Sequence, residues 1–212
     1  MIIMVNRRPT GPATRLTRVV AAFCAVVTAF LPVAASAHPG INGHFHGFAY
    51  GFAHPFSGID HVLAMVAVGL FAAHLGGRAF WVVPLSFVSV MALAGVAGMA
   101  GISLPFTEAG IALSVVVLGL AVALQINLPT LVASALVGFF AVFHGYAHGT
   151  EMPGSLSGLA YAFGFICATL LLHAIGVGLG VAISRTGQVF NRRVVQIGGA
   201  TISVIGAFLL LR

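Results

Sequence analysis

Long apolar segments alternate with short polar links along most of this chain. Six of these segments lie near residues 57–75, 79–101, 105–124, 129–148, 156–183 and 194–211. Each is close to the roughly 20 residues that a helix needs to cross a lipid bilayer. The links between them are too short to hold a soluble domain. The pattern therefore predicts an all-α fold, a polytopic membrane bundle of six transmembrane helices, with residues 38–212 as its single domain.

The first 37 residues have the pattern of a secretory signal peptide. Arginines are concentrated in residues 7–18, an apolar stretch covers residues 19–34, and residues 35–37 (Ala-Ser-Ala) fit a cleavage site. We expect cleavage there, so that the mature chain begins at His38. The alternative is an uncleaved signal anchor, which would add one helix.

The composition agrees with a membrane protein. The chain is 60% hydrophobic and only 6% charged, whereas a soluble domain has about 25% charged residues. Lipid must therefore cover most of its surface. The net charge of +6 does not indicate nucleic-acid binding, because without the signal segment five arginines face three acidic residues, a formal charge of +2. The chain has no lysine, which excludes a Walker A loop and ATP hydrolysis by that route.

The positions of the arginines predict how the bundle is oriented. Arginines occur in the links at residues 76–78 and 184–193, and the positive-inside rule places such links in the cytoplasm. A cleaved signal independently places His38 on the outer side. In this topology the acidic residues of the chain all lie at the outer face: Asp60, Glu108 and Glu151.

Two polar stretches contain most of the residues with metal-binding chemistry. They are residues 54–61 (HPFSGIDH) and residues 144–151 (HGYAHGTE), and they hold two of the three acidic residues beside histidines. Imidazole and carboxylate together suit a divalent transition metal, and their presence in apolar surroundings marks a functional site by default. The candidate metal ligands are His54, Asp60, His61, His144, His148 and Glu151.

Each stretch also has a structural interpretation. His144 and His148 are four residues apart and share one helix face, where they could form hydrogen bonds between helices. Gly149 could end that helix as a glycine cap, but Glu151 would then face the negative end of the helix dipole, which is unfavourable. In the first stretch, Ser57 and Asp60 have the spacing of a capping box, which does not explain the histidines beside them.

Further residues are candidates for a pathway or an entrance. Glu108 lies at the start of the third apolar segment, where the helix dipole favours a carboxylate. It could therefore be a helix cap or a residue of the metal pathway, and the two roles remain equally open. Met65, one turn after His61, offers a thioether or simply packs. His74 and His173 lie within apolar segments. Each could be a relay ligand for the metal or an ordinary hydrogen-bonded residue. Three upstream histidines could collect metal before it enters: His38, His44 and His46.

The pattern differs from that of a closed zinc site. The chain has no CxxC pair and no HExxH motif, and a structural zinc site more often contains cysteine. Mixed histidine and carboxylate ligands give the reversible affinity that permeation requires, because an ion must enter favourably and still leave. We therefore expect a transported metal and no prosthetic group.

Both motifs resemble those of a known family. The H-x5-D-H pattern (His54, Asp60, His61) and the F-H-G-x-A-H-G-x-E pattern (residues 143–151) are similar to those of the HupE/UreJ hydrogenase and urease accessory proteins. The resemblance covers essentially the whole mature chain. It implies a nickel permease of the bacterial inner membrane, and the topology predicted from the arginines places its N-terminus and metal motifs on the periplasmic side. It also implies metal-handling roles for His54, Asp60, His61, His148 and Glu151, and His144 matches the same motif.

The resemblance implies Ni²⁺ as the cargo, with Co²⁺, copper and Zn²⁺ left open, and an indirect link to the maturation of nickel enzymes. We expect a permease and not an enzyme. The alternatives are a membrane-embedded zinc hydrolase with Asp60 or Glu151 as its base, a bis-histidine haem protein, and a metal-binding protein without transport. A homo-oligomer also remains open.

Overall fold

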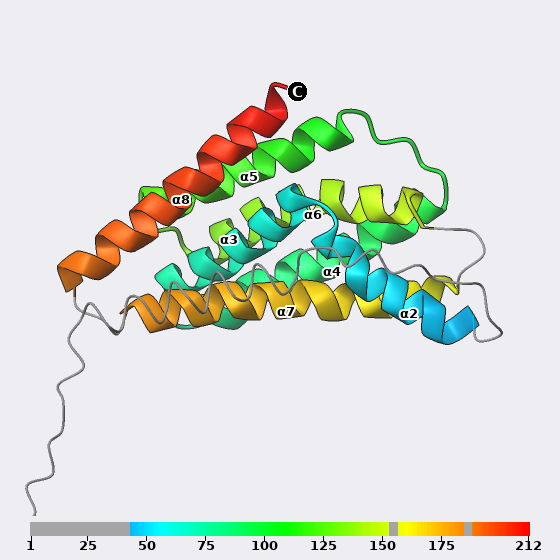
Figure 1. The fold of residues 1–212 in the computed structure, drawn as a ribbon, viewed down its shortest axis with the longest axis horizontal. Helices are drawn as coiled ribbons and strands as arrows, with labels where there is room; N and C mark the ends of the chain where they lie inside the picture. Colours follow the sequence, from blue (N-terminus) through cyan, green and yellow to red (C-terminus); the bar gives the residue numbers. More distant parts are fainter. Residues whose placement is uncertain (1–42, 153–156, 185–187) are drawn as a thin grey trace, which may run out of the picture. The chain divides into compact units, whose positions relative to one another are not determined.

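The computed structural model describes residues 43–152, 157–184 and 188–212. These residues are mostly helical, and they contain no β-strand. The helices, coloured along the chain in Figure 1, are α2 (Gly43–Ala53), the 3₁₀ turn η1 (His54–Phe56), α3 (Ile59–Leu75), α4 (Ala79–Met99), α5 (Thr107–Ala123), α6 (Thr130–Thr150), α7 (Gly158–Ser184) and α8 (Gln188–Leu210). The predicted all-α class is confirmed for this part of the chain. The predicted signal peptide and His38 lie outside the described residues.

The six predicted segments correspond to the helices from α3 to α8. Four helices, α4, α6, α7 and α8, are long and apolar enough to cross a membrane. The end of α2 with η1 forms a pair with α3 that is bent by 81° and passes the same criterion as one unit. Helix α5 is apolar but has only 17 residues, which gives about 26 Å at 1.5 Å per residue. A helical membrane bundle is therefore supported, whereas six complete spans stay a prediction.

Helix α2 was not predicted, because it precedes the first of the predicted apolar segments, which begins near residue 57. It packs against α7 through small residues. A Cβ atom on Gly51 would overlap the backbone of Tyr161, and one on Gly164 would overlap the backbone of Phe48. The four-residue glycine spacing from Gly47 to Gly51 is the sequence signal that could have indicated this helix.

Small residues also bring the longer helices together in pairs. Helix α6 packs mainly on α4, and Gly145 and Gly149 face the backbone of Met91 and Gly95 with no room for a side chain. In lipid, such close backbone approach supplies van der Waals contact where the hydrophobic effect between helices is weak. The four-residue spacing of Gly145 and Gly149 places both on this face of α6. The alternative in which Gly149 is a glycine cap is wrong, because α6 continues to Thr150 and its C-cap is Glu151.

Helix α3 lies at the centre of the helix contacts. It contacts each of the helices from α4 to α8, whereas α5 pairs mainly with α8 and α7 mainly with α3 and α2 (Figure 1). Its apolar side chains Met65, Val68 and Phe71 are completely buried in the core. Large apolar side chains such as Leu131 and Leu159 lie on the outside, as expected for a surface that faces lipid. The polar first turn of α3 is thereby held among the other helices.

Candidate metal centre

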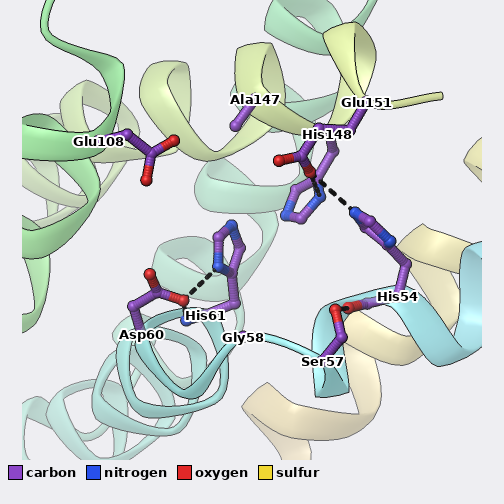
Figure 2. A pocket seen from close by; sticks show the side chains of 9 residues that line it. All are labelled: His54, Ser57, Gly58, Asp60, His61, Glu108, Ala147, His148 and Glu151. Carbon is purple, nitrogen blue, oxygen red and sulfur yellow. Dashed lines mark hydrogen bonds and ion pairs between the residues drawn. The ribbon is translucent and has the colours of Figure 1, made fainter. Parts of the chain in front are cut away.

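The two polar stretches meet at one pocket. A cavity of about 200 Å³ lies between four elements (Figure 2). It is lined by the turn η1, the first turn of α3, the last turns of α6 and the first turn of α5. Five of the six candidate ligands line it, together with Glu108, and His144 does not. The lining residues are His54, Ser57, Gly58, Asp60, His61, Glu108, Ala147, His148 and Glu151. The helix packing therefore gathers all three acidic residues of the chain at one place.

Three ligand groups converge around Glu151. His54 Nε2 lies 2.9 Å from Glu151 Oε2, and His148 Nδ1 lies 3.7 Å from the same oxygen. One ligand atom from each of these residues lies within 4.8 Å of the other two. Imidazole and carboxylate bind first-row metals at about 2.0–2.2 Å, so small side-chain rotations would close the three atoms around one ion. Glu151 is half-exposed and His148 is buried, so this set joins the surface to the interior.

The backbone before α3 fixes the position of His54. The hydroxyl of Ser57 donates to the His54 carbonyl oxygen at 2.6 Å, and the backbone N–H of Ser57 donates to the same oxygen. The N-cap of α3 is Gly58, in an extended conformation and without a side-chain cap. The predicted capping box of Ser57 and Asp60 is therefore wrong, because the 3₁₀ turn uses the serine hydroxyl and Asp60 already lies inside the helix.

Asp60 orients the imidazole of His61. One carboxylate oxygen of Asp60 accepts the backbone N–H of His61 at 2.7 Å and lies 2.6 Å from His61 Nδ1 (Figure 2). If Nδ1–H donates to this carboxylate, Nε2 carries the lone pair. His61 Nε2 is buried and has no hydrogen-bond partner among the described residues. A carboxylate behind an imidazole in this way is the usual support of a metal-binding histidine.

His144 lies one turn below His148 on α6 and is completely buried. Its Nε2 lies 2.9 Å from the hydroxyl oxygen of Ser114, which lies 2.6 Å from the Ile111 carbonyl oxygen. The carbonyl can only accept, so the single proton of the serine hydroxyl goes to Ile111, and Ser114 accepts the Nε2–H of His144. The lone pair of His144 is then on Nδ1, which has no hydrogen-bond partner within the described ranges.

The four histidines form a continuous series from the pocket into the bundle. The ring centroid of His148 lies 4.9 Å from that of His54 and 4.3 Å from that of His61, and the rings of His61 and His144 are 4.8 Å apart. Leaving a buried polar atom without a partner costs about 1–3 kcal/mol. A cation shared among these lone pairs would remove that cost.

Comparison with known proteins places the chain in a family. The sequence profile of the HupE / UreJ protein family matches residues 25–209. The chain belongs to this family. It is also 47% identical over 182 residues to Protein HupE of Rhizobium leguminosarum bv. viciae, a match that covers 85% of this chain and 92% of that protein. No solved structure matches. The predicted relationship to HupE/UreJ proteins is confirmed.

Aromatic residues that were not predicted as part of the site pack against the histidines of this HupE/UreJ chain. Phe165 on α7 packs against His148, with ring centroids 4.0 Å apart, and Tyr161 lies 5.9 Å from the ring of His54. Tyr50 stacks on His54 from α2. These rings limit how the imidazoles can turn. The four-residue spacing of Tyr161 and Phe165 places them on one face of α7, but nothing in the sequence indicates that this face meets the histidines.

The remaining candidates of this family member lie at different places. Glu108 is exposed and lines the pocket from the first turn of α5, a position that suits a pathway residue as well as the helix dipole. Met65 is completely buried in the core, below His61. His44 and His46 belong to α2, but their side chains are outside the described structure. His74, at the last turn of α3, has a buried Nε2 atom without a hydrogen-bond partner among the described residues.

Proposed function

We propose that this chain is a permease of the bacterial inner membrane for a divalent transition metal, with Ni²⁺ as the first candidate. It would supply metal for the maturation of hydrogenase or urease, in keeping with its family. The observation that carries the proposal is the convergence of His54, His148 and Glu151 at the mouth of a buried histidine series. Possible ligands therefore continue from the pocket into the bundle, whereas the ligands of a closed structural site would all lie at the pocket.

In the proposed mechanism, the ion first exchanges part of its water shell for ligands at the pocket. The carboxylates of Glu151 and Asp60 offset its charge, and the imidazoles of His54 and His148 supply nitrogen ligands. The ion then passes to His61 and His144, whose lone pairs are set by Asp60 and Ser114. The pocket faces the periplasm in this proposal, because the arginine-containing links are at the opposite ends of the helices.

Metal uptake into proteoliposomes tests this function. We expect vesicles with the purified protein to accumulate Ni²⁺ faster than protein-free vesicles, and Co²⁺, Cu²⁺ and Zn²⁺ supplied singly should establish the selectivity. We expect uptake either by facilitated diffusion down the metal gradient or with proton linkage. Vesicles that take up none of the four metals would contradict the proposal, as would one zinc ion per chain retained after extended dialysis.

Ser114→Ala tests the support of His144. Removing the hydroxyl leaves the Nε2–H of His144 without its acceptor, so the ring no longer presents Nδ1 in a fixed orientation. Loss of such a supporting partner lowers metal affinity by roughly tenfold or more. We expect a decrease of this size in the apparent affinity for Ni²⁺ in uptake assays. Ser134→Ala is the matched control, since this buried serine has no hydrogen-bond partner among the described residues, and equal effects of both variants would refute the role of Ser114.

A further inference from the structure

His173 is a buried histidine that the proposed site does not use. It lies within α7, its side chain is 2% exposed, and neither ring nitrogen has a hydrogen-bond partner within the described ranges. The sequence left open an ordinary hydrogen-bonded histidine or a relay ligand. The first interpretation does not fit, because a buried imidazole N–H without an acceptor destabilises the fold by about 1–3 kcal/mol. An unpaired ionisable residue at such a position is a functional candidate by default.

A stripe on α7 leads from the pocket to His173. Tyr161, Phe165, Thr169 and His173 follow one another at intervals of four residues, and all are buried. Phe165 contacts the ring of His148, and His173 lies eight residues further along the helix. At 1.5 Å per residue this separation is about 12 Å. His173 is therefore about two turns deeper in the bundle than the pocket, on the same face of α7.

Phe87 of α4 connects this position to the histidine series. Its ring centroid lies 5.5 Å from that of His144 and 5.2 Å from that of His173. Phe87 is completely buried. One turn along α4, the sulfur of Met91 accepts a 3.8 Å hydrogen bond from Thr169 of the α7 stripe. His144, the deepest member of the histidine series, and His173 thus share one aromatic neighbour, and the thioether of Met91 lies close by.

We propose that His173 is an inner binding station for the transported divalent cation, reached from His144 past the ring of Phe87. This inference rests on the proposed function. The inner station offers imidazole without a carboxylate, so it should hold a divalent ion less tightly than the pocket does. A weaker second site lets the ion leave the first one and move on, as conduction requires. The Phe87 ring, in contact with both imidazoles, would limit the exchange between the two sites.

Replacement of His173 by leucine separates this role from a structural one. We expect the Ni²⁺ affinity of His173→Leu in equilibrium dialysis to stay within about twofold of wild type, because the pocket ligands are intact. Its rate of Ni²⁺ uptake should fall at least about tenfold, and a tenfold change corresponds to about 1.4 kcal/mol. Its unfolding temperature should not fall, since an apolar side chain replaces an unpaired polar one. Leu172→Ile, at the neighbouring buried position, is the packing control. Unchanged uptake by His173→Leu would overturn the proposal.

A thiol at the same position gives a measurement that does not depend on transport. In a full-length protein with Cys24 and Cys167 replaced by serine, we expect Cd²⁺ to slow alkylation of the His173→Cys thiol in the folded protein by a small membrane-permeant reagent. The thiol of Leu172→Cys should remain unprotected. Equal protection of both thiols, or of neither, would overturn the inner station. If the wild type takes up no metal, the permease proposal fails, and the Cd²⁺ measurement still decides whether cations reach position 173.

Discussion

Glu151→Gln is expected to reduce Ni²⁺ uptake at least tenfold while leaving the protein folded. The substitution keeps the shape of the side chain and its ability to bond with His54, but it removes the negative charge at the point where three ligand groups converge. Hydrogen bonds and contacts to ionised groups are roughly twice as strong as neutral ones, and a tenfold loss in affinity corresponds to about 1.4 kcal/mol. Uptake in proteoliposomes and Ni²⁺ binding by equilibrium dialysis should fall together.

Glu108→Gln is the matched comparison for this variant. Glu108 is a second carboxylate that lines the same pocket, but it does not belong to the close group formed by His54, His148 and Glu151. We expect its loss to reduce uptake by only about twofold, through the weaker attraction of a more distant charge in a hydrated mouth. Equal decreases in both variants would mean that the pocket only concentrates cations, and coordination by Glu151 would be refuted.

Gly149→Ala is expected to disrupt both the fold and the site. A Cβ atom on Gly149 would overlap the backbone of Gly95 and crowd that of Met99. Backbone cannot move aside as a side chain can, so α6 and α4 must separate, and overpacking of this kind costs about 1–3 kcal/mol or more. The last turn of α6 also carries His148. Thermal unfolding in detergent should therefore shift to lower temperature, and Ni²⁺ uptake should fall with it.

Gly138→Ala provides the control on the same helix. A Cβ atom there would lie 3.5 Å from a methyl group of Val90, an ordinary contact distance, and it too faces α4. Alanine is favoured over glycine inside a helix by about 1 kcal/mol, so this variant should be as stable as wild type or slightly more so. If Gly149→Ala behaved like Gly138→Ala, close approach of the two backbones would not determine the position of the site.

Much of the fold could be predicted from the sequence because a bilayer restricts what a chain can do. Apolar segments of about 20 residues have few alternatives to helix in lipid. The helices from α3 to α7 agree with the predicted segments within two residues at each end, whereas α8 begins six residues earlier than predicted. Helix α2 could not be found in this way. It has 11 residues, and its close approach to α7 depends on glycines whose role is set by the packing partner.

The candidate site was predicted in part, for a similar reason. Acidic residues and histidines are scarce in an apolar chain, so their clustering at residues 54–61 and 144–151 is informative. Ser114 was missed because a single serine in an apolar segment has many possible roles, and only the fold brings its hydroxyl to His144. Phe165 was missed because aromatic residues are common in such helices. The capping box failed because the 3₁₀ turn before α3 could not be read from local spacing.

The 81° break before α3 has a consequence for how one short motif can grip an ion. Two side chains seven residues apart on an unbroken helix would sit two turns, or about 10 Å, from each other along its axis. Across the break, the rings of His54 and His61 instead both approach His148, at 4.9 and 4.3 Å. The bend between η1 and α3 therefore brings both imidazoles to the same side of the pocket. The number of residues between His54 and His61 then determines the distance between the two rings.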